Sequence, residues 1–127
     1  MSDAVSSAMM SQGDIADKIT ILELKAKHGG GTAELDALLP EWKGDEVDLN
    51  NMRVLNQAGW DVVGRIHQYF DGGIHGDARK IIEDCFNAHR LNKIRVEFKN
   101  RINKKFGQHE EYKTWRTEEK VRDERVL

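Results

Sequence analysis

Four polar side chains in the C-terminal half of the chain recur at helical spacing. Asn92, Arg95, Lys99 and Asn103 are three or four positions apart, so in a helix they share one face. A guanidinium offers a two-pronged donor to phosphate or carboxylate, and a lysine adds a diffuse positive charge. The two amides would then bind polar edges of the same ligand. The spacing predicts an anion site on this face.

Two lysines from an earlier helix are predicted to complete that site. Lys18 and Lys25 are seven positions apart, which places them on one flank of that helix. The alternative is that nearby acids neutralise these cations in surface ion pairs worth about 0 to 1 kcal/mol each. The candidate neutralising acids are Asp14, Asp17, Glu23 and Glu97. The sequence leaves both interpretations open.

The polar face continues an apolar one. Ala78, Ile81, Cys85 and Ala88 begin the stripe that the polar residues extend, so its chemistry changes midway. Burying polar groups is costly unless they are paired. Either the helix leaves the core where the polar residues begin, or the polar half of the helix binds another group. Cys85, within the apolar half, is expected to be a small buried thiol.

The elements that must position these residues are all predicted to be helices. Apolar stripes at a period of 3.6 predict a first helix between Gly13 and Gly29, a short second helix that bears Leu35, Leu38 and Leu39, and two long helices over 46–70 and 77–106. Pro40 ends the short second helix, which Thr32 is expected to cap. No stretch alternates like a strand. The fold class is therefore all-α, a small antiparallel helical bundle built on a long helical hairpin.

Composition and charge narrow the class of protein. The 127 residues fit one helical domain over 13–115, with a flexible arm over 1–12 and a charged tail over 116–127. Twenty basic against 22 acidic residues give a net charge of -2, so no overall field attracts a nucleic acid polymer or an anionic membrane. No apolar run could span a bilayer and no export signal is visible. These features predict a cytoplasmic protein.

Two of the predicted helices carry a second apolar face. Ile21 and Leu24 lie opposite the main stripe of the first helix, and Leu91 and Phe98 belong to a second stripe on the last one. Isolated apolar faces of this size are unusual in water. The pattern therefore predicts a homo-oligomer.

Other chemical motifs are weak. The Gly-Gly-Gly run at 29–31 follows a helix and lacks the Gly-Lys-Ser/Thr of a phosphate loop, and no cysteine or histidine pair has zinc-site spacing. His67, Asp71 and His75 could approach a metal, although they are also ordinary polar loop residues. No nucleophile is marked. The sequence thus identifies no catalytic residue, metal ligand or cofactor, and leaves catalysis open.

Two segments together resemble a family. GDIADKITILELK (13–25) and NKIRVEFKNRIN (92–103) resemble the motifs Gly-Glu-Leu-Ile-Asp-Lys-Ile-Thr-Ile-Leu-Glu-Ile-Lys and Asn-Asp-x-Arg-x-x-Leu-Lys-x-x-Ile-Asn of an uncharacterised family of small bacterial helical proteins. Val63 and Gly64 stand where that family carries acids. The resemblance supports the fold and the choice of residues, and it implies a setting beside sugar-transfer machinery but no reaction.

Three functions follow, in order of preference. The first is non-enzymatic binding of a small phosphate-bearing ligand, a nucleotide or sugar nucleotide, for sequestration or presentation to a partner. The second is a protein-protein interaction module with no small-molecule ligand, in which the polar residues give specificity. The third is a small hydrolase using His67, Asp71 or His75. The predicted ligand residues are Lys18, Lys25, Asn92, Arg95, Lys99 and Asn103.

Overall fold

The described part of the chain is built from helices alone. The computed structural model describes residues 10–71, 73–74 and 76–110, and no strand occurs among them. In chain order the elements are α2 (Gln12–Lys27), α3 (Ala33–Leu38), the 3-10 turn η1 (Leu39–Glu41), α4 (Glu46–Phe70) and α5 (Ala78–Lys105). The predicted all-α fold is confirmed, and both long helices lie within one residue of their predicted bounds.

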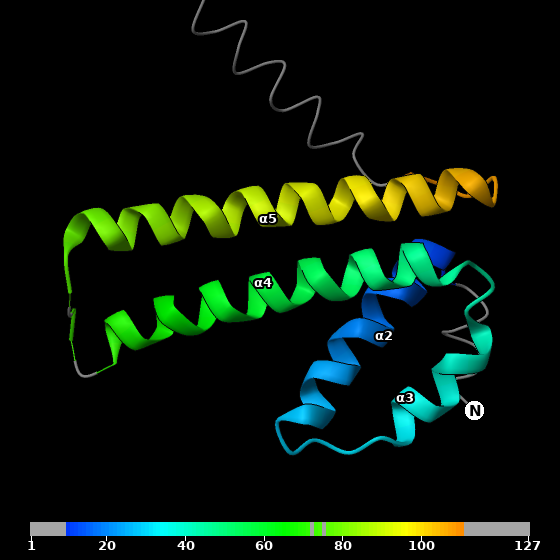
Figure 1. Ribbon diagram of the computed structural model, residues 1–127, viewed down its shortest axis with the longest axis horizontal. Coiled ribbons are helices and arrows are strands. Elements are labelled where there is room, and N and C mark those ends of the chain that lie inside the picture. Colours follow the sequence, from blue (N-terminus) through cyan, green and yellow to red (C-terminus); the bar gives the residue numbers. More distant parts are fainter. Residues whose placement is uncertain (1–9, 72, 75, 111–127) are drawn as a thin grey trace, which may run out of the picture.

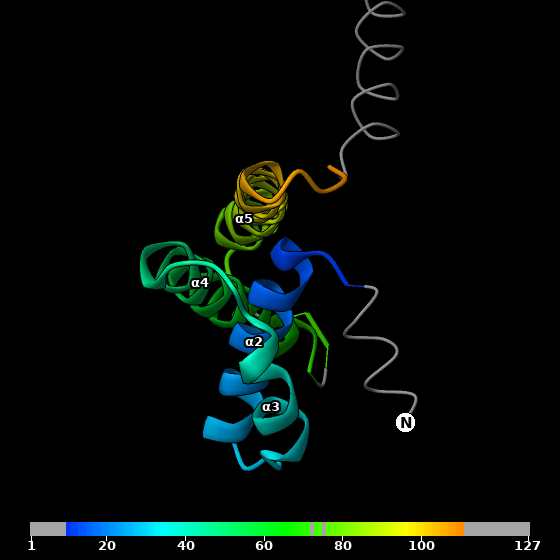
Figure 2. The ribbon, with the colours of Figure 1, turned by 90° about the vertical axis from the view of Figure 1, so that its right-hand side faces the viewer.

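A long antiparallel hairpin of α4 and α5 forms the frame of the molecule (Figure 1). Asp45 and Asp77 begin the two helices, and each side chain accepts a hydrogen bond from a backbone N–H of the first turn. Figure 2 looks nearly along α5 and shows α4 and α2 packed beneath it. The hairpin extends well beyond α2, so two helices rather than three make up its far half.

Helix α2 begins at a serine cap and ends at glycine. The Ser11 hydroxyl accepts from the N–H of Asp14 at 3.1 Å, and Gly29 follows the helix with a φ of 97° that disfavours other residues. The face that α2 presents to the hairpin carries Ile15, Ile19 and Leu22, all buried. This spacing of four and three positions is the predicted apolar stripe.

The turn formed by α3 and η1 closes the open side of α2. Leu38 is buried against the core and Trp42 packs beside it. The buried side chain of Gln12 joins the turn to α2, since its Nε2 donates to the Glu41 carbonyl at 3.0 Å and its Oε1 accepts from the Lys43 N–H at 2.8 Å. Thr32 precedes α3, but its side chain makes no capping hydrogen bond, so that prediction is wrong.

The main core lies where α2 crosses the hairpin. It joins the apolar face of α2 to Leu49 and Met52 of α4 and Ile102 of α5. Because α2 is 16 residues long and α5 is 28, only one end of α5 can be covered. The covered end is the end that carries the polar stripe.

The apolar half of the α5 stripe consequently lies outside the core. Ala78 and Cys85 are exposed, while Ile81 and Ala88 are half-buried. The expected buried thiol is therefore wrong, since Cys85 is an exposed free cysteine. The change of chemistry along α5 coincides with the arrival of α2: Lys99 and Asn103 are buried, Arg95 is half-buried and Asn92 is exposed.

The predicted arm and tail fall mostly outside the described residues. Positions 1–9 and 111–127 are not described, so the arm over 1–12 and the tail over 116–127 stay predictions there. Gln12, assigned to the arm from sequence, is the first residue of α2. Within the described ranges no helix is long and apolar enough to cross a membrane.

Candidate binding surface at the junction of the three helices

The closest approach between α2 and α5 is made by a glycine and an asparagine. The N–H of Gly13 donates to Oδ1 of Asn103 at 2.7 Å, and Asn103 is fully buried. The other end of the same amide donates from Nδ2 to the carbonyl of His109 at 3.0 Å. Both ends of the Asn103 amide are therefore engaged within the chain, and the absence of a side chain at Gly13 lets the two helices meet.

Two ion pairs continue the contact along α5. Lys99 Nζ lies 2.8 Å from Asp14 Oδ1, and the lysine side chain is only 8% exposed. One turn earlier, Arg95 Nη1 lies 3.2 Å from Asp17 Oδ2, while its Nη2 donates to Asn92 Oδ1 at 2.9 Å. Each cation of the polar stripe faces a carboxylate of α2, which is the alternative that the sequence left open.

A buried amide on α4, which residue spacing did not single out, joins this network. Asn56 Nδ2 donates to Asp17 Oδ1 at 3.0 Å and to Thr20 Oγ1 at 2.7 Å. Asp17 thus links all three helices, because it pairs with α5 and accepts from α4. An asparagine beside the apolar stripe of α4 was the available clue, but spacing alone does not identify its partner.

The six predicted ligand residues do not converge on one site. Asn92, Arg95, Lys99 and Asn103 lie along α5 toward α2, whereas Lys18 pairs with Glu34 at 3.5 Å. Lys25 is exposed near the end of α2. Arg95, Lys99 and Asn103 contact α2 directly, Asn92 supports Arg95, and the two lysines lie apart from this contact.

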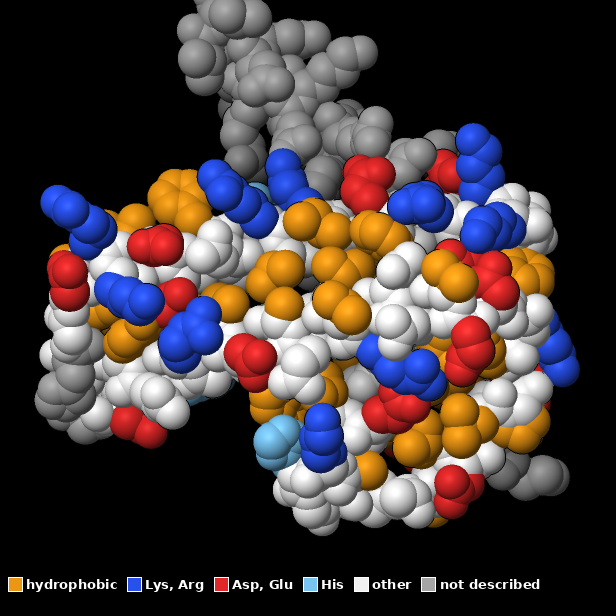
Figure 3. All heavy atoms as spheres, viewed as in Figure 1, with side chains coloured by type: hydrophobic (Ala, Val, Ile, Leu, Met, Phe, Trp, Pro, Cys, Tyr) orange, Lys and Arg blue, Asp and Glu red, His pale blue; other side chains and the backbone are white. Residues whose placement is uncertain are grey.

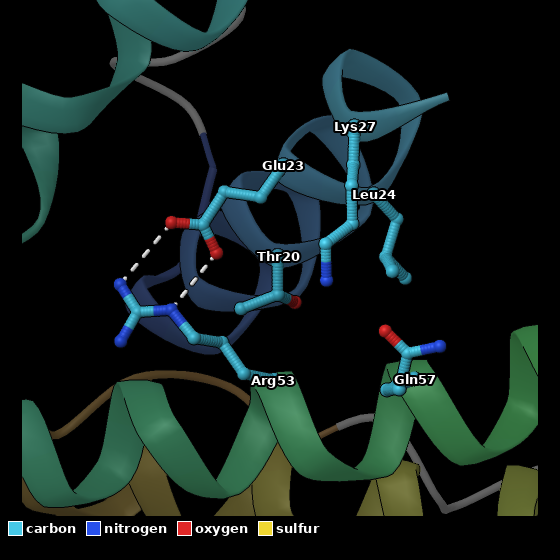
Figure 4. Close-up of a pocket in the computed structure, with 6 residues that line it drawn as sticks. All are labelled: Thr20, Glu23, Leu24, Lys27, Arg53 and Gln57. Carbon is cyan, nitrogen blue, oxygen red and sulfur yellow. Dashed lines mark hydrogen bonds and ion pairs between the residues drawn. The ribbon is translucent and has the colours of Figure 1, made fainter.

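A small polar pocket lies between α2 and α4 (Figure 4). It encloses about 150 Å³ and is crossed by a two-pronged ion pair, in which Arg53 donates from Nε and Nη2 to the two Glu23 oxygens at 2.9 and 3.2 Å. The hydrogen bonds to Glu23 raise the pKa of Arg53 above its ordinary value. Lys27 reaches the pocket from α2 and Gln57 from α4. The Arg53–Glu23 pair is neutral as a unit, and Lys27 leaves the lining with one positive charge in surplus.

A larger apolar groove opens where α2 leaves the hairpin. It encloses about 370 Å³ and takes residues from all three helices. Its lining is Ile21, Leu24, Leu55, Asn56, Gly59, Trp60, Val63, Ala88, Leu91, Asn92 and Arg95.

The groove is open to solvent on the α4 side. Trp60 is 38% exposed and Val63 is 44% exposed, although both are large apolar residues. The Trp60 ring stacks on His28 just after α2, with ring centroids 4.9 Å apart and planes 13° from parallel. This stack holds the indole at the rim. The polar end of the groove is the Arg95 and Asn92 pair described above.

The far half of the hairpin is joined by its own buried carboxylate. Asp84 is 4% exposed and accepts from Arg65 Nε at 3.2 Å and from the Tyr69 hydroxyl at 2.5 Å. The hydrogen bonds from Arg65 and Tyr69 lower the pKa of Asp84 below its ordinary value. The same bond raises the pKa of Tyr69, because the hydroxyl donates its proton to a carboxylate.

This cluster predicts a pH-dependent contribution to stability. A carboxyl whose pKa is lower in the folded state stabilises the fold above its unfolded pKa of about 4 and loses that contribution as the pH falls. The melting temperature of Asp84→Asn should therefore lie below that of the wild type by a constant gap between about pH 5 and 7, and the gap should narrow below about pH 4. Thermal melts in a buffer series measure this. If the two melting temperatures differed as much at low pH as at neutral pH, the lowered pKa of Asp84 would be contradicted.

The predicted metal ligands do not form a described cluster. His67 is exposed in the last turn of α4 and Asp71 follows that helix, whereas His75 lies outside the described residues. Among the residues that the structure describes, no group of three or more His, Cys, Asp or Glu side chains is placed to hold a metal ion.

Comparison with known proteins adds no assignment. No family model, no curated protein and no solved structure matches the chain.

Proposed function

We propose that this protein is a helical interaction module that binds an amphipathic helix of a partner protein in the apolar groove. The observation that carries the proposal is the open continuation of the α4 and α5 seam beyond α2, with Trp60 and Val63 half-exposed at its rim. Contiguous exposed apolar surface is uncommon on small soluble domains and marks sites of association.

The chain itself shows what fits this seam. Helix α2 fills the near end with Ile15, Ile19 and Leu22, and it lines the groove with Ile21 and Leu24 from another side. A second helix with apolar side chains at the same spacing would continue along the same seam. Recognition of an amphipathic helix by a groove uses such i, i+4, i+7 anchors.

The charges beside the groove support a protein partner over a free anion. Arg95 is paired with Asp17, and Lys99 with Asp14, so the polar stripe brings no surplus positive charge to the groove. An anion binding Arg95 would lie beside the Asp17 carboxylate, and like charges at such distances repel. A helix whose polar edge carries a neutral hydrogen-bonding side chain avoids this cost at Arg95 and Asn92.

Binding of a small phosphate-bearing ligand stays a separate prediction. It requires Arg95 to exchange or share its contact with Asp17. A ligand at 100 times its dissociation constant adds about 2.7 kcal/mol to stability. A melting screen with nucleotides and sugar nucleotides therefore tests this prediction independently of the groove.

The direct test of the module is selection from a displayed library of helical peptides. We expect the enriched peptides to carry large apolar residues at i, i+4 and i+7, and we expect Trp60→Asp to weaken their binding at least 30-fold, since a central tryptophan anchor is typically worth about 2 kcal/mol or more. Fluorescence anisotropy of a labelled peptide measures the affinity.

A matched variant separates the groove from general surface effects. Val47 is exposed on the first turn of α4, away from the groove, so Val47→Asp should leave peptide affinity unchanged while Val63→Asp lowers it. Selected peptides that bind wild type and Trp60→Asp equally, or a library that yields no helical binder, would overturn the proposal.

A further inference from the structure

The face of the hairpin opposite α2 is also apolar, and within the described residues no element covers it. Figure 3 shows hydrophobic side chains gathered near the middle of this face, along the line where α4 and α5 meet. Val54 of α4 is 62% exposed and Ile94 of α5 is 42% exposed. This surface is separate from the groove, which takes residues from α2.

Helical geometry places Ile94 away from α2. Ile94 comes one position before Arg95, and one position corresponds to about 100° around a helix. Because Arg95 points to α2 through Asp17, Ile94 lies on a different side of α5. Phe98 follows one turn later, half-buried against the core, with the Arg101 guanidinium 4.8 Å from its ring centroid.

Two exposed charges of opposite sign flank this apolar surface. Glu83 and Arg101 are eighteen positions apart, which is about five helical turns, so both lie on the same line of α5. Neither makes an ion pair with another residue in the described ranges. Midway between them along the helix axis is the level of Asn92, whose side chain lies on the opposite side, while Ile94 lies two positions further and within about 20° of the line that joins the two charges. A surface with opposite charges at equal distances from its centre is complementary to itself when turned by 180°.

We propose that a second copy of the chain binds this face across a two-fold axis, with the two α5 helices antiparallel. Ile94 of each copy then lies near the centre, and Glu83 of each copy faces Arg101 of the other at the two ends. The paired hairpins form a four-helix arrangement, which is a common way to bury such faces. The dimer does not depend on the groove, because the two surfaces lie on different sides of the hairpin.

Charge reversal tests the two-fold arrangement. Glu83→Arg and Arg101→Glu each place like charges together at both ends of the dimer, and each should raise the dimer dissociation constant about tenfold. The double variant Glu83→Arg/Arg101→Glu restores opposite charges and should return the constant to near the wild-type value. Sedimentation equilibrium between micromolar and submillimolar concentrations gives these constants.

Matched isoleucines test the apolar centre. Ile94→Asp should abolish the dimer while keeping the helical circular dichroism spectrum, whereas Ile82→Asp, exposed on another side of α5, should leave the dimer intact. A wild-type protein that stays monomeric throughout would overturn the proposal. So would a dimer that survives Ile94→Asp, or a double charge reversal that fails to recover the affinity of the wild type.

Discussion

Replacing Gly13 by alanine is expected to lower the free energy of unfolding by about 2 to 4 kcal/mol. A Cβ at this position would lie 2.5 Å from the Lys99 carbonyl oxygen and 2.7 Å from Asn103 Oδ1. Such distances are shorter than van der Waals contact, and one of the two atoms belongs to the backbone of α5. The helices must therefore separate, which also breaks the hydrogen bond from Gly13 to Asn103.

The natural control is another helical glycine. A Cβ at Gly64, within α4, meets no atom within 4 Å. Because alanine has the higher helix propensity, Gly64→Ala should raise the free energy of unfolding by about 0.5 to 1 kcal/mol. Urea titrations of both variants measure the difference. Equal stability of Gly13→Ala and wild type would show that α2 does not approach α5 as closely as the structure has it.

Replacing Asn103 by leucine should cost a similar amount, about 2 to 4 kcal/mol. Leucine has nearly the same size but leaves the Gly13 N–H without its acceptor and the His109 carbonyl without its donor. Buried groups that lose a hydrogen-bond partner carry their full desolvation cost. The loss should appear as a lower urea midpoint, while the slope of the unfolding free energy against urea concentration stays unchanged.

An exposed asparagine provides the comparison for that variant. Asn50 is exposed on α4, so Asn50→Leu should change the free energy of unfolding by no more than about 0.5 kcal/mol. If Asn103→Leu were as stable as Asn50→Leu, Asn103 would not be a structural contact, and its assignment as a ligand residue would regain support.

Most of the fold could be predicted because the apolar spacing, the capping residues and the glycine stops all indicate the same helices. Residues 46–70 carry an apolar stripe between Asp45, which caps the helix, and the glycines after Phe70, and the structure places α4 over the same range. Long proline-free segments between glycine stops leave few alternatives to a helical hairpin. The weak point was Thr32, where the residue type suited a cap but the backbone conformation did not.

The burial along α5 could not be predicted because it depends on where another helix ends. The sequence shows that apolar positions up to Ala88 give way to polar ones from Asn92. It does not show that α2 reaches only the polar half, so Cys85 is exposed while Lys99 is buried. The Trp60 groove went unnoticed for the same reason, since it exists only where α2 stops short.

The candidate site shows the same limit. Both the cations and the acids were visible in the sequence, and two interpretations followed from them. In the structure Asp14 pairs with Lys99 and Asp17 pairs with Arg95. The segments 13–25 of α2 and 92–103 of α5 therefore contact each other. Residue spacing within one helix predicts a shared face, but only the crossing of two helices decides which charges meet.

One crossed measurement tests the central claim that the polar stripe holds α2 while the groove binds a partner. Melting temperature and affinity for a selected helical peptide are measured on Asn103→Leu and Trp60→Asp. The account predicts that Asn103→Leu melts at a lower temperature and binds the peptide as wild type does, whereas Trp60→Asp keeps its melting temperature and loses the peptide. Loss of peptide affinity in Asn103→Leu, measured well below its melting temperature, with full affinity in Trp60→Asp, would contradict it.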